Sequence, residues 1–225
     1  MAFALMDVDK LRGLPEWTQS PGEELANTIT HGLGLVGALV GTPILLLAAL
    51  ETGSDGFFIG TIIFAVTMLL LYLGSTLYHA WPQTRGKGVL QVLDHSAIFL
   101  LIAGTYTPFT LGPLRGVWGS TMFGVIWALA IFGVMIKSTR GVSRHRKFGF
   151  SLYLGTGWLG LILIRPLAAV APMSTVFWLL AGGIAYTAGV IFFVNERRRY
   201  NHFVWHLFVL TGTSCHFLAL LTYAA

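Results

Sequence analysis

Seven apolar stretches dominate the sequence and constrain its fold more than any other feature. A helix that crosses a bilayer needs about 20 apolar residues. Seven long segments contain no Asp, Glu, Lys or Arg, namely 25–50, 56–84, 95–114, 116–136, 148–164, 166–195 and 200–225. In the sixth segment, the helix is expected to start at about residue 174. The fifth is marginal and is expected to extend past Arg165 and Pro166. We therefore predict an all-α fold, a seven-transmembrane helix bundle.

Composition agrees with a membrane-embedded chain. Only 10% of the residues are charged, against about 25% in an ordinary soluble domain. The net charge of +5 comes from basic residues in short loops, so it predicts membrane topology and no nucleic-acid partner. We expect residues 1–24 to be a short cytoplasmic segment without a cleaved signal peptide. Residues 25–225 are expected to form one domain that has the lipid bilayer as its partner.

The basic residues also predict the orientation of the bundle. Seven crossings put the termini on opposite sides, and cytoplasmic loops carry an excess of Lys and Arg. Arg115 and Arg165 fall on one side. The other side holds twelve basic residues, namely Lys10, Arg12, Arg85, Lys87, Lys137, Arg140, Arg144, Arg146, Lys147, Arg197, Arg198 and Arg199. The prediction is a cytoplasmic N-terminus and an outside C-terminus, the reverse of a G-protein-coupled receptor.

Histidines gather at the predicted cytoplasmic ends of four helices. His202 and His206 are four residues apart and share one face of a helix. His79 lies six residues before Arg85, and His31 lies seven residues after Glu24. Ionisable groups within membrane spans generally face the bundle interior or one another. This pattern predicts a metal site formed by His79, His202 and His206.

Three more residues lie close to the candidate site. Asp94 and His95 are expected to open the third helix, and Ser75 lies one turn before His79. Asp94 can bind or deprotonate a metal-bound water, although a residue at a helix N-terminus can also serve only the macrodipole. His95 points about 100° away from Asp94 and is not favoured. Ser75 can hydrogen-bond a ligand or an oxyanion. We predict Asp94 and Ser75 as catalytic residues.

Other histidines have plainer interpretations. A lone His31 can hydrogen-bond a neighbouring helix. His216 lies ten residues beyond His206, about 15 Å along the helix, so it is predicted to form an interhelical hydrogen bond outside the metal site. His145 is expected to be solvated among basic residues. The glycines of the first span, Gly32, Gly34, Gly37 and Gly41, are expected to permit close helix approach.

Three imidazoles without a thiolate favour zinc, although iron, copper and nickel also accept such ligands. Three histidines leave a fourth position for water, whose pKa zinc lowers to about 7. A hydrolytic site follows from this arrangement. The same residues also suit a structural ion that holds three helices together.

Several sequence blocks resemble the hemolysin III branch of the progestin and adipoQ receptor family. They are Glu23-Glu24, Asn27 and Thr30-His31-Gly32; Ser75-Thr76-Leu77-Tyr78-His79; Leu93-Asp94-His95-Ser96 through Thr107-Pro108; and His202-Phe203-Val204-Trp205-His206 through His216-Phe217. The resemblance implies seven helices, a cytoplasmic N-terminus and zinc ligands at His79, His202 and His206. It also implies that Asp94 binds through the metal's water, that Ser75 belongs to the site and that His216 is not a ligand.

What the resemblance implies about activity leaves three hypotheses. Relatives associated with ceramidase activity favour a zinc-dependent hydrolase of lipid amide bonds, with a lipid substrate. Bacterial members described as pore-formers favour a channel or membrane-energetics protein with a structural zinc. A receptor or sensor is the third hypothesis, although the chain lacks the long N-terminal domain of the receptors. That departure predicts a compact bacterial member in the inner (plasma) membrane. Substrate and oligomeric state are not specified.

Overall fold

The computed structural model describes residues 19–82, 84–140, 146–195 and 198–225. These residues form eight α-helices, and α5 and α6 together make one crossing, Phe148–Ala168. Seven segments are long and apolar enough to span a membrane, as predicted. The helices are α1 (Pro21–Glu51), α2 (Asp55–Ala80), α3 (Arg85–Leu111), α4 (Val117–Arg140), α5 (Arg146–Trp158), α6 (Leu161–Ala168), α7 (Met173–Val194) and α8 (Asn201–Ala224).

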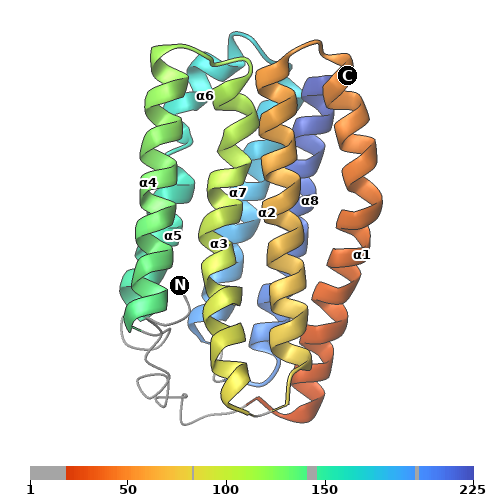
Figure 1. Ribbon diagram of the computed structural model, residues 1–225, viewed down its shortest axis with the longest axis vertical. Coiled ribbons are helices and arrows are strands. Elements are labelled where there is room, and N and C mark those ends of the chain that lie inside the picture. The colour runs from red at the N-terminus through yellow and green to blue at the C-terminus, as the bar shows by residue number, and fades with distance from the viewer. Residues whose placement is uncertain (1–18, 83, 141–145, 196–197) are drawn as a thin grey trace.

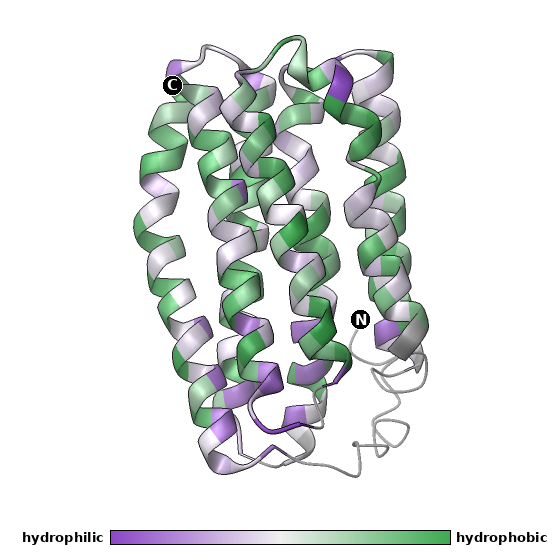
Figure 2. Ribbon diagram, turned by 180° about the vertical axis from the view of Figure 1, so that it is seen from behind, coloured by the Kyte–Doolittle hydropathy of each residue, from purple (hydrophilic) through white to green (hydrophobic). Residues whose placement is uncertain are grey.

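The helices run roughly parallel to one long axis, and α8 closes the bundle (Figure 1). Successive helices α1 to α4 pack side by side, while α8 packs against both α1 and α7. The bundle is apolar over most of its length, and polar residues gather at one end (Figure 2). That end holds the start of α1, the end of α2 and the starts of α3 and α8, and we call it the polar end.

Local sequence signals set the limits of the first two helices. Ser20 caps α1 with Glu23 as its partner, because the Ser20 side chain accepts from the Glu23 backbone and the Glu23 carboxylate accepts from the Ser20 N–H at 3.0 Å. This capping box lets α1 begin before the charge-free segment does. Helix α2 ends at Ala80, four residues before the predicted limit. Pro82 follows, and the residue before a proline avoids helical geometry.

The start of α3 corrects the sequence prediction. The helix begins at Arg85, ten residues before the predicted start, so Asp94 and His95 lie well inside it and Asp94 does not serve as an N-terminal helix residue. The prediction used segments without charged residues and therefore excluded Lys87. In the structure Lys87 is buried and paired with Glu24. Its ammonium lies 2.8 Å from Glu24 Oε1 and donates to the Trp81 carbonyl at 3.0 Å. A paired charge of this kind is tolerated within a membrane span.

The glycines of α1 differ in how they contact their neighbours. A Cβ atom added at Gly34 would lie 2.6 Å from the Tyr72 ring of α2, and one at Gly41 would lie 3.0 Å from Phe217 of α8. These two positions permit the close helix approach that was predicted. Gly37 has no atom within 4 Å of such a Cβ. The prediction is wrong there, because Gly37 faces outward.

Candidate metal centre

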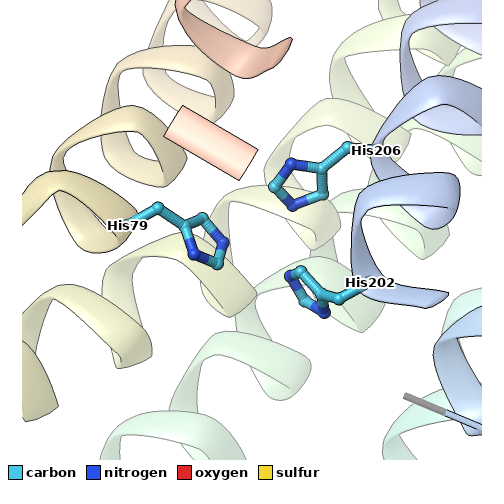
Figure 3. Close-up of side chains that lie close together, drawn as sticks. All are labelled: His79, His202 and His206. Carbon is cyan, nitrogen blue, oxygen red and sulfur yellow. The ribbon is translucent and has the colours of Figure 1, made fainter. Parts of the chain in front are cut away.

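Three histidines from two helices converge at the polar end of the bundle. His79 comes from the last turn of α2, and His202 and His206 come from the first two turns of α8 (Figure 3). Their candidate ligand atoms all lie within 4.8 Å of one another, which is close enough to hold one metal ion. All three side chains are buried. The grouping matches the predicted ligand set.

The donor atoms present fit a metal. His79 Nε2 and His206 Nδ1 are buried and make no hydrogen bond to any residue that the structure describes. Buried polar atoms in proteins nearly always have a partner, and a shared ion would satisfy both of these at once. Three imidazole nitrogens also suit zinc, which catalytic sites often bind with three protein ligands.

Glu24 orients one of the three imidazoles. The Nδ1–H of His79 donates to Glu24 Oε2 at 2.7 Å, which leaves Nε2 of His79 as the atom that can bind an ion. The other carboxylate oxygen accepts from Lys87 at 2.8 Å. A carboxylate that holds a metal-ligating histidine in this way fixes the ring orientation and raises ligand basicity. Sequence reasoning gave Glu24 no role at the site.

Asp94 and Ser75 lie beside the three histidines. Asp94 of α3 is buried, and it is close enough to both His202 and Ser75 for each to act electrostatically on its carboxylate. Ser75 lies one turn before His79 on α2, fully buried, and its Oγ makes no well-formed hydrogen bond among the described residues. Neither residue belongs to the group whose atoms can share one ion. Their position suits contact with a group bound next to an ion held by the three histidines.

His31 is a fourth imidazole at the site. Its ring stacks on His206, with centroids 3.6 Å apart and planes 7° from parallel, and meets the Tyr72 ring edge-on. Neither ring nitrogen hydrogen-bonds a residue in the described part of the chain. The expected hydrogen bond to a neighbouring helix is therefore not formed there. The ring packs flat against His206, one of the three clustered histidines, and this restricts how the His206 ring can turn.

The remaining histidines lie outside the cluster. The His95 ring stacks on Phe193, and its backbone carbonyl accepts from the Tyr153 hydroxyl at 2.8 Å. The prediction for His216 is confirmed, because its Nε2 lies 3.3 Å from the Leu179 carbonyl of α7. His145 lies outside the described residues.

An apolar cavity of about 170 Å³ begins within one helical turn of this site. Leu71 is four residues before Ser75, Ile98 is four residues after Asp94 and Trp205 adjoins His206, and all three line the cavity. Leu114 and Leu167 line it as well, and they lie toward the opposite end of the bundle from the histidines. The walls are mainly aliphatic and aromatic side chains of α3, α5, α6, α7 and α8. A long apolar group can occupy such a space.

Comparisons with known proteins agree with this architecture. The family model described as haemolysin-III related matches residues 20–217. The chain is 41% identical over 201 residues to a Hemolysin-3 homolog of Bacillus subtilis (strain 168), covering 89% of this chain and 94% of the relative. It is 43% identical over 206 residues to Hemolysin-3 of Bacillus cereus, covering 92% and 94%. Identity to the human monocyte to macrophage differentiation factor is 27% over 213 residues, covering 89% and 84%.

Proposed function

This chain belongs to the haemolysin-III related family of membrane proteins, and we propose that it is a zinc-dependent hydrolase of lipid amide bonds, as in ceramide. The observation that carries the proposal is the apolar cavity that begins beside the three-histidine cluster. A lipid chain in that cavity brings its polar end close to the histidines. The basic loops favour a cytoplasmic position for this end of the bundle.

Each residue of the site has its own role in the proposed reaction. His79, His202 and His206 are the zinc ligands in this proposal, with Glu24 orienting His79. Bound zinc supplies Lewis-acid chemistry, polarising a carbonyl and making water acidic enough to ionise near pH 7. Asp94 accepts the proton of the attacking water and returns it to the leaving amine. Ser75 hydrogen-bonds the carbonyl oxygen, because its hydroxyl adjoins Asp94 and lies one turn from His79.

A hydrolysis assay on the purified protein tests the proposal. Protein that carries zinc is mixed with a C18 ceramide in detergent micelles, and released fatty acid is measured by mass spectrometry. We expect turnover, and we expect Asp94→Asn to retain zinc while losing at least about 100-fold in rate, because it lacks the proton acceptor. Zinc-loaded wild-type protein that releases no fatty acid from any lipid amide contradicts the proposal.

A structural ion is the second candidate, and one observation favours it. The histidine cluster joins α2 to α8, whereas these two helices pack mainly on other neighbours. An ion bound there adds a second link between these helices at the polar end, far from the ring contact of Phe57 with Tyr223. The relatives named Hemolysin-3 would then suggest a protein that perturbs membranes. Dye release from liposomes that is unchanged in Asp94→Asn, combined with no hydrolysis, is the outcome that supports this candidate.

The contact between Glu24 and His79 gives a prediction about metal affinity. Glu24→Gln keeps the shape of the side chain but removes the negative charge that holds the His79 ring in its orientation, so we expect zinc affinity to fall about 10- to 100-fold. Competition with a fluorescent chelator measures this change. Glu23→Gln is the matched control, because Glu23 binds Ser20 and the Tyr200 backbone and not a histidine. Equal affinities in the two variants would show that Glu24 does not act through His79.

A further inference from the structure

The apolar cavity extends by the same distance along three helices. Its lining runs from Ile98 to Phe109 on α3, from Leu179 to Val190 on α7 and from Trp205 to His216 on α8, a separation of eleven residues in each case. Eleven residues of helix span about 16 Å. A volume of about 170 Å³ spread over this length makes the cavity narrow, with the shape of one extended hydrocarbon chain.

Two buried leucines close the end of the cavity that lies farthest from the histidines. Leu114 follows the C-terminus of α3, and its N–H donates to the Phe109 carbonyl at 2.9 Å, which keeps this segment folded against the end of the helix. Leu167 lies in the last turn of α6, at the same end of the bundle (Figure 1). Both residues line the cavity, and they are 9% and 3% exposed. We call Leu114 and Leu167 the cavity floor.

The wall between the histidines and the floor has few polar groups that are available to a ligand. The hydroxyls of Thr105, Tyr106 and Thr187 each donate to a backbone carbonyl, and that of Tyr186 bonds Thr213 Oγ1 at 2.7 Å. The other residues of the wall are mainly aliphatic and aromatic. Apolar contact is non-directional and treats every methylene alike. Discrimination between hydrocarbon chains therefore depends on how far they reach.

The cavity also reaches the side of the bundle, but it continues past that point. Gly157 and Leu161 line it where α5 gives way to α6, and both are exposed. Leu167 lies six residues beyond Leu161 in α6, about 9 Å along the helix. A chain that starts at the histidines therefore has room to pass this opening and to end inside the protein.

We propose that Leu114 and Leu167 determine the length of the acyl chain that the cavity accepts. The ligand class is a straight acyl chain whose polar end lies at the histidines and whose terminal methyl group meets the floor. A shorter chain leaves empty space above the floor and loses packing contacts. A longer chain must displace a packed side chain. The inference rests on the proposed function in taking an acyl chain in this direction as the occupant, and it adds selection by length.

Binding of a series of fatty acids to the zinc-loaded, full-length protein tests this inference without requiring turnover. The probes are the even-numbered saturated acids from octanoate to docosanoate, each in competition with the same fluorescent fatty acid in detergent. We expect the affinity to be greatest at one length, and to fall at least about fivefold when the chain is two carbons longer. Equal affinities across the series, or no binding of any acid, overturn the inference.

Substitutions at the floor should move the preferred length in opposite directions. Leu167→Ala removes three carbon atoms from the floor, so we expect the preferred acid to be about two carbons longer. Leu167→Phe fills the same space, and the preferred acid should be about two carbons shorter. Leu45→Ala is the matched control, because Leu45 is also buried but does not line the cavity. It should lower stability without changing the preferred length.

Thermal unfolding in detergent shows which floor variants are folded, and Leu114→Ala takes the place of Leu167→Ala if that variant is not. A preferred length that stays at the wild-type value in the folded floor variants overturns the inference, because the chain then ends elsewhere, as at the opening beside Gly157. A preferred length that shifts as expected, without hydrolysis of any lipid amide, refutes the proposed function and leaves this inference standing. Hydrolysis without any preferred length has the opposite meaning.

Discussion

Purified His202→Ala protein is expected to bind zinc at least about 100-fold more weakly than the wild type. Structural zinc sites contribute about 10–16 kcal/mol in total, so one ligand of four accounts for roughly 3 kcal/mol, which corresponds to about a hundredfold change. His79→Ala and His206→Ala should behave alike, because the three candidate ligand atoms lie within 4.8 Å of one another. Elemental analysis after dialysis measures the bound metal, and ceramide hydrolysis should fall with it.

His216→Phe is the matched control for the three alanine variants. It also removes an imidazole from α8, but its Nε2 bonds Leu179 and it lies outside the cluster. It should retain a full complement of zinc. Thermal unfolding of each variant in detergent separates loss of metal from loss of fold. Undiminished zinc in all three alanine variants, with the fold intact, would exclude this metal site.

The sequence was sufficient to predict the fold and the grouping of the three histidines because both depend on local patterns. Apolar length specifies crossings, and the (i, i+4) spacing of His202 and His206 places them on one face. The inclusion of His79 is predicted from its depth in the membrane alone, once the basic residues indicate which helix ends lie on the same side. The same reasoning found that His216 is too deep for the site, and its interhelical hydrogen bond confirms this.

The parts that could not be predicted depend on partners from distant segments. The true start of α3 was missed because Lys87 is neutralised by Glu24, a residue of another helix. The role of Glu24 was missed for the same reason, although it lies two turns before His31 on one face of α1. Stacking of His31 on His206 likewise requires the packed arrangement of α1 and α8. Contacts between distant segments cannot be predicted from the charge and spacing of residues within one segment.

The contact between α2 and α3 gives the last prediction, a loss of stability in Gly60→Ala. A Cβ at this position would lie 2.5 Å from the Cα and 2.7 Å from the N of Pro108, and backbone atoms of a helix cannot turn aside as a side chain can. The two helices must separate, and overpacking of this kind costs about 1–3 kcal/mol or more. We expect a clear fall in the midpoint of thermal unfolding in detergent.

Gly37→Ala is the matched control, since it makes the same substitution in a membrane-spanning helix where no atom lies within 4 Å of the new Cβ. Its stability should be unchanged or slightly raised, because alanine favours a helix over glycine by up to about 1 kcal/mol. The close approach at Gly60 matters for the candidate site as well. Helix α2 carries Ser75 and helix α3 carries Asp94, so a wider spacing between these helices moves the two catalytic candidates apart. Equal unfolding midpoints for Gly60→Ala and Gly37→Ala would mean that the helices accommodate the extra methyl group, and that their spacing does not fix the position of Asp94.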